Sequence, residues 1–523
     1  MHIFFVCVRQ QMYLCSRFFK VLLKQDMKTK AILTGIMLAT AATTAQAGGI
    51  LTNTNQSIDF LRNPARDAAI GLDGVYSNPA GVAFMPEGFH LGFNWQYAHQ
   101  TRTITSTNPY LVLGKKNNGS GTKIFEGVAD APCIPSLQAA WNKNNWSLQF
   151  NLSVPGGGGS CEYADGLGSF ENTVGSIANQ LKPLGATGYD MDGYMQGRQY
   201  YFGFQVGTAY KVNEHLAVYG GMRLLYGSAT YKAKISNIMV RLANDQYVNF
   251  GSFLESAATT VDAGLDQVNA GMAQYEDAGA TALPQYAELV AKKAQLEGTK
   301  GSLNALQKYS EGVNLLCNQS SVGIAPVVGI DYKIGQFNFA AKYEFKTEIH
   351  MKNESTVNQA SEIAAVNKFR DGEEVNEDQP ALLALGAQWS PVDVVRLNAG
   401  WHHYFDKSAN WYNNSQNLLD HDSNEFLLGA EWDINDRVTI SLGGQVTRYG
   451  LTDQYMNDMS FVVNSYSLGF GANFKVSDNV IVKGGYFQTN YGDYDRKDYP
   501  TTGVSDSFTR TNYVLGLGCE LTL

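Results

Sequence analysis

The alternation of very short and very long connections is the feature that most limits how this chain can fold. Fourteen candidate strands lie between Gly88 and Leu523. Tight turns are predicted at Asn142–Asn145, Val212–His215, Gly335–Gln336, Pro391–Val392, Ile434–Asp436 and Ser477–Asn479. Long connections are predicted at about 107–133, 155–198, 238–319, 351–378, 406–422, 451–460 and 492–507. A soluble β-sandwich has no reason to sort its loops by length, whereas an outer-membrane barrel has short periplasmic turns and long external loops.

The late candidate strands alternate strictly between two kinds of side chain. In Tyr513–Leu523, apolar residues at every second position are separated by Gly516, Gly518 and Glu520. This period of two is typical of a wall with lipid on one side and a polar or filled lumen on the other. An even strand number also places both ends of the barrel in the periplasm. The sequence therefore predicts an all-β membrane protein, with a 14-stranded antiparallel barrel over residues 88–523.

The composition is consistent with an outer-membrane barrel. The chain has 29 Tyr, 26 Phe and 53 Gly, and only 17% of its residues are charged. No apolar run after residue 47 approaches the roughly 20 residues that a membrane helix needs. The formal net charge is −9 and there are no basic runs, which argues against nucleic acid as a partner.

The N-terminal region reads as an export signal. Met27–Lys30 is a short basic segment, Ala31–Ala42 is apolar, and Ala45–Ala47 is an A-x-A cleavage site. We therefore expect cleavage after Ala47. Because Met27 alone begins a complete signal peptide, residues 1–26 are interpreted as an over-called start; the alternative is a real N-terminal anchor helix.

Four cysteines remain after cleavage: Cys133, Cys161, Cys317 and Cys519. The sequence has no C-x-x-C and no Cys/His cluster, so it predicts neither a metal site nor a cofactor. In an exported protein a loop disulfide is an open possibility, and the pair Cys161–Cys317 is the candidate. Cys519 lies on an alternating apolar face and is expected to face lipid.

A compact segment precedes the first strand. Ile58, Leu61 and Ala65 recur at helical spacing, and the segment ends in the turn sequence Asn78, Pro79, Ala80 and Gly81. On these grounds alone it is a surface helix and a loop. Because a barrel follows it, residues 48–87 are a candidate plug, or hatch, for the lumen.

Two of the long connections have distinctive sequences. Residues 254–313, within the predicted connection 238–319, show two helical repeats separated by a proline, which predicts an αα-hairpin on the outer face. The connection at 155–198 begins with the run Pro155, Gly156, Gly157, Gly158 and Gly159, which cannot hold a regular ladder. This run is interpreted either as a flexible linker or as a deliberate break in the barrel wall.

These features together resemble the FadL family of outer-membrane long-chain fatty acid transporters. The resemblance rests on the Asn78-Pro79-Ala80 motif between the signal peptide and the first strand, on the strand number and on the long helical third external loop. It implies that a hydrophobic ligand settles in an external groove, moves to a pocket inside the barrel and leaves sideways into the membrane. A change in the hatch and a kink in the third strand, here Trp146–Val154, would allow that exit. It also implies a monomer that meets membrane lipid and the barrel-assembly machinery.

Other functions remain as alternatives at this stage. No nucleophile elbow or triad spacing appears, so an enzyme is not expected. A general porin, or a structural barrel with adhesive loops, is the runner-up. A carboxylate ligand would need a cation nearby, and Arg62, Arg66 and Arg102 are candidates for that contact, although each is also compatible with an ordinary solvated or paired arginine. The ligand itself, whether a fatty acid, an aromatic hydrocarbon or a bile-acid-like amphiphile, is left open.

Overall fold

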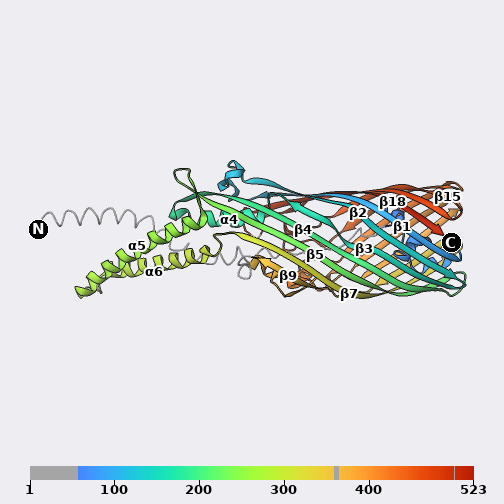
Figure 1. The fold of residues 1–523 in the computed structure, drawn as a ribbon, viewed down its shortest axis with the longest axis horizontal. Helices are drawn as coiled ribbons and strands as arrows, with labels where there is room; N and C mark the ends of the chain where they lie inside the picture. Colours follow the sequence, from blue (N-terminus) through green and yellow to red (C-terminus); the bar gives the residue numbers. More distant parts are fainter. Residues whose placement is uncertain (1–56, 358–363, 500) are drawn as a thin grey trace.

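In the computed structural model, which describes residues 57–357, 364–499 and 501–523, antiparallel strands close into a barrel (Figure 1). Fourteen wall strands make up the described barrel: β1 (Gly88–Thr107), β2 (Thr122–Lys143), β3 (Trp146–Tyr163), β4 (Ala186–Lys211), β5 (Leu216–Leu242), β7 (Val313–Ile334), β8 (Phe337–Glu344), β11 (Leu382–Val392), β12 (Val395–Tyr404), β13 (Ser423–Asn435), β14 (Val438–Arg448), β15 (Ser465–Ser477), β16 (Val480–Tyr491) and β18 (Ser505–Thr522). Pairing of β1 with β18 closes the ring. The predicted 14-stranded antiparallel barrel is confirmed.

The two ends of the barrel differ as the sequence predicts. Each pair of strands expected to be joined by a tight turn is so joined, although the turn predicted at Pro391–Val392 lies at 393–394, because β11 extends to Val392. Figure 1 shows the C-terminus at the end of the barrel opposite the helices. The long-loop end carries α4 (Gly168–Gln180), α5 (Phe250–Asp277) and α6 (Pro284–Gln307), and the short strands β6 (Tyr247–Asn249), β9 (His350–Val357), β10 (Glu374–Asn376) and β17 (Tyr494–Arg496). Helices α5 and α6 form the predicted hairpin. Among the described residues, no helix is both long and apolar enough to cross a membrane.

Several predicted boundaries are wrong because the wall strands continue further than expected. Strand β3 ends at Tyr163 instead of Val154, and β4 begins at Ala186, so the connection between them is 164–185 instead of 155–198. The glycine run stays within the strand because Gly157 and Gly159 adopt positive φ angles of 83° and 88°, which form bulges without ending the pairing. Helix α4, which fills most of the true connection, was not predicted.

The outer face of the wall is apolar. Leu442, Leu468 and Leu517 are 61%, 54% and 59% exposed, and each alternates with residues that face the lumen. Cys519 lies on the same outward face, opposite Phe93 in the register with β1, as expected. A continuous band of exposed apolar side chains is stable only in lipid.

The proposed disulfide between Cys161 and Cys317 does not form, because both thiols are free. Cys161 lies on β3 and Cys317 on β7, with β4 and β5 between them in the wall. Three strand spacings place β3 and β7 about 14 Å apart, which is far beyond the reach of a disulfide.

Residues 57–87, called the hatch segment here, lie against the inner face of the wall. The segment contains α3 (Ile58–Arg62) and the 3₁₀ turns η2 (Leu72–Val75) and η3 (Gly81–Phe84). Ser57 caps α3 by accepting a hydrogen bond from the Phe60 amide. The predicted longer helix is wrong: α3 ends at Arg62, because Pro64 excludes a helical conformation for the residue before it. Residues 1–56 lie outside the described residues, and so do the predicted signal peptide, its cleavage site and the first part of the predicted hatch.

A belt of inward glycines makes room for the hatch segment. A Cβ atom at Gly469 would lie 2.1 Å from the Leu61 carbonyl oxygen, and one at Gly386 would lie 2.5 Å from the Ala68 amide nitrogen. The belt crosses neighbouring strands from β11 to β18: Gly386, Gly400, Gly429, Gly443, Gly469, Gly471, Gly485, Gly516 and Gly518. At each of these positions a Cβ atom would come too close to the backbone or to a side chain of the hatch segment, which leaves no space for a side chain on the wall.

The belt predicts that a side chain at Gly469 displaces the hatch segment. Gly469→Val should expose Arg62 and Arg66, which are now buried, to trypsin in the refolded protein. Gly484→Val is the matched control, because a Cβ there meets nothing nearer than 3.9 Å. Rapid cleavage of the Gly469 variant alone is the expected result. Equal resistance of both variants would mean that the segment does not depend on the belt.

Candidate functional site

A buried ionic network joins the first half of the hatch segment to the wall. Arg62 Nη2 lies 2.7 Å from Asp59 Oδ1 and 2.8 Å from Glu431 Oε1, which faces the lumen from β13. Arg66 lies 2.7 Å from Asp73 and 3.0 Å from the same Glu431 oxygen. One wall carboxylate therefore joins two arginines of the hatch segment. The structure gives Arg62 and Arg66 protein carboxylates as partners, which matches the paired alternative noted from the sequence.

The network continues into the neighbouring strands. Lys483 Nζ, from β16, lies 2.5 Å from Asp59 Oδ2 and 2.6 Å from Glu520 Oε2. Arg396 Nε, from β12, lies 3.2 Å from the second oxygen of Glu431. Burial makes each of these charges costly unless it is paired, and here each has a partner of opposite sign. Sequence reasoning missed these wall residues, although a charge at an inward position of an alternating strand was the available signal.

The second half of the hatch segment is held mainly by the hydrogen bonds of amide side chains. Asn78 Nδ2 donates to Asp331 Oδ2 at 2.6 Å, and Asn78 Oδ1 accepts from the Gly81 amide at 3.2 Å. Pro79 presents its carbonyl to Gln149, and Ala80 is fully buried. A Cβ at Gly81 would lie 2.3 Å from Asn78 Nδ2, which accounts for the glycine. The Asn-Pro-Ala-Gly motif is thus a turn tied to β7 by its asparagine.

Amide side chains of the wall bind three more carbonyl groups nearby. Asn338 Nδ2 donates to the Ala68 carbonyl at 2.7 Å, and Gln205 Nε2 donates to that of Val75 at 3.0 Å. Asn142 Nδ2 donates to the Val82 carbonyl at 2.8 Å. These bonds satisfy the backbone of an irregular segment that water does not reach.

A cavity with about 790 Å³ of empty space borders the hatch segment. Phe60, Tyr76 and Ser77 of that segment line one side of it. The wall contributes both apolar and charged side chains, among them Tyr201, Arg223, Leu225, Lys342, His402 and Glu425. Pro155 of β3, the first residue of the proline–glycine run, also lines the cavity. The cavity therefore meets the hatch segment and the bulged part of the wall.

The ladder between β2 and β3 is interrupted next to that cavity. Leu137 pairs with Leu152 and Asp130 pairs with Ser160, but the described residues between these two pairs are not paired with each other. On its other side β3 carries two bulges against β4, between Ser153 and Gly156 and between Gly157 and Ser160. The proline–glycine run is thus part of a bulged strand that has lost its pairing on one side.

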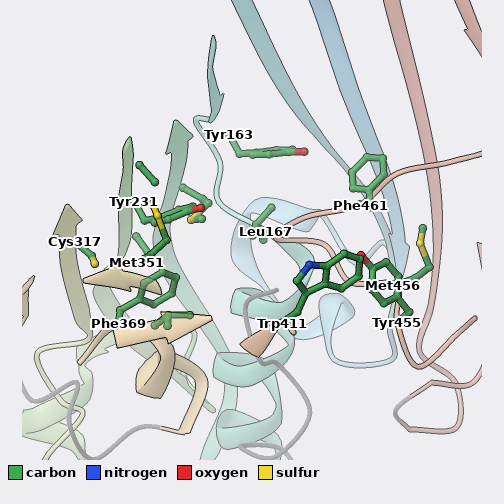
Figure 2. Close-up of a cluster of buried hydrophobic side chains, with 14 of the residues drawn as sticks. Tyr163, Leu167, Tyr231, Cys317, Met351, Phe369, Trp411, Tyr455, Met456 and Phe461 are labelled. Carbon is green, nitrogen blue, oxygen red and sulfur yellow. The ribbon is translucent and has the colours of Figure 1, made fainter. Parts of the chain in front are cut away.

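A second, strongly apolar cavity lies at the long-loop end. It has about 1380 Å³ of empty space between α4, α5, the end of α6 and the upper parts of β4 and β5. Its lining includes Phe170, Val174, Ile177, Ile235, Phe250 and Leu306. A cluster of buried hydrophobic side chains separates it from the inner cavity, and Figure 2 shows Tyr231, Phe369, Trp411 and Phe461 in this cluster. Tyr201 and Leu225 belong both to the cluster and to the inner cavity.

Part of that cluster comes from loops that fold inward. Phe369 ends the 3₁₀ turn η8 (Ala364–Phe369), and its ring centroid is 5.2 Å from that of Tyr231. The neighbouring Lys368 forms a buried ion pair with Glu377. Burial is the largest influence on both groups: it lowers the pKa of Lys368 and raises the pKa of Glu377, and the attraction between them opposes each change.

Two inward arginines occupy the lumen near the same loops. Arg102 on β1 and Arg510 on β18 are directly opposite each other in the strand register. In the described part of the chain neither lies within 4.0 Å of a carboxylate. Arg102 lies over the Phe461 ring and Arg510 over the Tyr491 ring, and Arg510 Nε is buried without a hydrogen-bond partner. Of the three arginines considered from the sequence, Arg102 alone has no carboxylate partner among the described residues.

Comparisons with known proteins identify the fold. No family model matches the sequence, and no curated protein sequence does. A FadL homologue from Pseudomonas aeruginosa is similar in structure at 11% identity and a TM-score of 0.56, covering 91% of this chain and 99% of that one. The Pseudomonas putida toluene transporter TodX matches at 13% identity, with a TM-score of 0.52 and coverage of 87% and 94%. The Ralstonia pickettii toluene transporter TbuX matches at 12% identity, with a TM-score of 0.50 and coverage of 90% and 99%.

These likenesses concern the fold, which is the fold of FadL-type barrels, as the sequence resemblance predicts. A closed barrel of fourteen strands with an apolar outer face is the architecture of a multi-pass outer-membrane protein. The short turns then face the periplasm, and the loops with α4, α5 and α6 face outward.

The ionic network predicts that Glu431 holds the hatch segment in place. Glu431→Gln leaves Arg62, Arg66 and Arg396 without a shared charge, and removing one partner of a buried ion pair typically costs about 3–5 kcal/mol. We expect frequent openings in single-channel recordings of the variant. Asp478→Asn is the control, because Asp478 pairs with Lys475 at an exposed turn and takes no part in the network. Identical, quiet recordings from both variants would show that the network does not hold the segment.

Proposed function

We propose that the protein takes up hydrophobic ligands, long-chain fatty acids or similar lipophilic compounds, across the outer membrane by hatch-gated passive diffusion. The ligand leaves sideways through the break in the wall. One observation carries the proposal: the inner cavity is bounded by Tyr76 of the hatch segment and by Pro155 of the bulged strand. Movement of the hatch segment would open this cavity toward the periplasm, and movement of the bulged strand β3 would open it toward the membrane.

The apolar linings support a hydrophobic ligand. Transfer of a hydrocarbon chain from water to apolar surroundings is favourable by about 0.8 kcal/mol per CH₂ group. The outer cavity offers almost entirely apolar walls, while the inner cavity adds charged groups to Tyr201 and Leu225. A ligand that reaches the inner cavity gains more by entering the bilayer through the wall than by crossing into water.

The break supplies the sideways route. Backbone groups of β2 and β3 between the pairs Leu137–Leu152 and Asp130–Ser160 are not joined across the ladder. Opening the wall there costs few backbone hydrogen bonds, whereas opening it between fully paired strands would leave many unsatisfied in lipid. Membrane lipid is the acceptor of the released ligand, and no chemical step is needed.

Arg102 and Arg510 support a ligand with an anionic end. Two cations directly opposite each other on neighbouring strands are destabilising, and a bound carboxylate between them would relieve that repulsion. The aromatic rings of Phe461 and Tyr491 lie beside them, so an anionic headgroup and an apolar tail would both find partners. Neutral aromatic hydrocarbons, which the names of two similar structures indicate for those proteins, are the other ligand class to test.

Straightening β3 tests the sideways exit. Each bulge holds one extra residue, so deletion of Pro155 and Gly158 gives β3 a regular register with β4. Cells that depend on this protein should then lose uptake of labelled oleate, while the barrel still folds, as judged by its heat-dependent electrophoretic mobility. The Gly484→Val protein is the matched folded control. Full uptake by the straightened barrel would exclude an exit through this part of the wall.

A general porin, or a structural or adhesive barrel, is the alternative function. Planar-bilayer recordings of the mature protein separate it from the proposal, with and without residues 48–87. A closed lumen predicts almost no conductance with the hatch segment and steady conductance without it, because the segment fills space between wall residues such as Gly469 and Gln205. Large, steady conductance in the intact protein would favour the porin.

A further inference from the structure

The outward face of the wall changes from apolar to basic along the neighbouring strands β4 and β5 (Figure 1). On β5 the outward positions from Leu216 to Tyr226 carry apolar side chains or glycine, and those that follow are polar and end in Lys232 and Lys234. The apolar stretch is about as long as the roughly 9–11 residues that a tilted strand needs to cross the membrane core. The polar positions therefore begin at the level of the outer-leaflet headgroups.

Stacked aromatic rings mark that level on both strands. The ring centroids of Tyr200 and Phe202 on β4 are 6.0 Å apart, and Phe202 stacks on Tyr226 of β5 at 6.4 Å. Aromatic side chains of membrane barrels gather at the boundary between the apolar core and the headgroups. Arg198 is the next outward residue of β4 beyond Tyr200. The basic residues thus lie immediately outside the aromatic boundary.

Arg198, Lys232 and Lys234, called the rim cations here, form a compact and exposed group. Arg198 is directly opposite Thr230 in the strand register, so Lys232 is its diagonal neighbour. Diagonal neighbours on one face of a sheet are roughly 7–8 Å apart, and Lys234 follows Lys232 by about 7 Å along the strand. A single lipid headgroup can therefore contact all three.

No carboxylate in the described part of the chain neutralises the rim cations. None lies within 4.0 Å of their nitrogen atoms, and Arg198 donates instead to Thr230 Oγ1 at 3.0 Å. Asp192 lies near Lys234, but it is already bound to Lys116 at 2.5 Å. The group is therefore open to an external anion.

Other outward charges border this group without entering it. Glu162 of β3 and Glu354 of β9 are exposed on the two sides of the group. Lys352 of β9 is directly opposite Glu374 of β10, so these two charges balance each other. The unbalanced positive charge is therefore confined to β4 and β5.

Other parts of the described rim have a different character. On β1 and β18 the outward positions carry threonines, and Thr101 bonds Thr511 through their hydroxyl groups at 2.6 Å. Arg448 of β14 is a single outward cation, and it donates to the carbonyl groups of Thr447 and Ser465. The rim cations are thus a local group, whereas general attraction to an anionic surface requires only scattered charge.

We propose that the rim cations bind the phosphate groups of a glycolipid in the outer leaflet. Arginine and lysine form charge-assisted hydrogen bonds with phosphate, and three cations within one headgroup suit a lipid with more than one phosphate. Thr230 donates to Asn318 of β7 at 3.0 Å, and this polar pair lies beside the cations to meet the sugar hydroxyls. The acyl chains lie below, against exposed apolar residues such as Met222 and Val322.

The site is independent of the proposed uptake function, because it uses only the outward face of the barrel. It adjoins the bulged part of β3, since Ser160 is opposite Arg198 and Gly157 is opposite Tyr200. The bound glycolipid is therefore a neighbour of the break in the wall.

Native mass spectrometry of the whole delipidated protein with added diphosphoryl lipid A tests the site. We expect one tightly bound lipid in the wild type. One basic residue near an anionic lipid surface changes binding by about fivefold, so Lys232→Gln should weaken binding by about that factor. Substitution of all three rim cations by glutamine should weaken it roughly a hundredfold if the contributions add. Lys232→Arg should restore binding, because it keeps the charge.

Arg448→Gln is the matched control, because it removes one outward cation from another part of the rim. Its binding should equal that of the wild type, and lipid A without phosphates should bind no variant. All substitutions are at exposed positions, and heat-dependent electrophoretic mobility checks that each barrel is folded. Equal binding by the triple variant, an equal loss in Arg448→Gln, or equally tight binding of phosphatidylglycerol would refute a glycolipid site at the rim cations.

Discussion

The pairing of charges inside the barrel is the constraint on which the rest of the structure depends. The hatch segment buries four charged residues, Asp59, Arg62, Arg66 and Asp73. The wall contributes Glu431 and Lys483, which form ion pairs with them. An unpaired buried charge is costly, so any displacement of the segment that separates these ion pairs is unfavourable. The glycine belt, the amide side chains and the cavity all follow from that placement.

This arrangement also divides the lumen into regions with different mechanical strength. The side facing β13 to β18 combines ion pairs with backbone packed on glycine. The side facing β3 to β8 relies mainly on single hydrogen bonds of amide side chains, among them that of Asn78 to the Asp331 carboxylate, and there the ladder between β2 and β3 loses part of its pairing. Motion is therefore easiest where the cavity, the Asn78 turn and the bulged strand meet.

The fold was readable from the sequence because its signals are local. Alternation within Tyr513–Leu523 and the tight turns depend on neighbouring residues alone. The alternation is confirmed, and each turn lies within two residues of its predicted place. The strand ends were not readable, because a proline–glycine run looks like a loop even when its glycines form bulges within a strand. The role of the hatch arginines was equally hidden, since Arg66 meets Glu431 at a separation of 365 residues. The loops whose aromatic side chains fill the lumen at the long-loop end follow no repeating pattern, so their inward folding could not be predicted.

The glycine belt also bears on the order in which the barrel can be assembled. Ile58, near the start of the described chain, packs on Gly516 and Gly518 of β18, and its amide donates to Asn94 of β1. The seam that closes the ring, β1 against β18, thus forms directly over the hatch segment. Because β18 is the last strand to be made, the earliest part of the segment has no complete seat until the final strand arrives. Contacts between such distant parts of a chain form slowly. The N-terminal segment therefore gains its full set of contacts only when the ring closes.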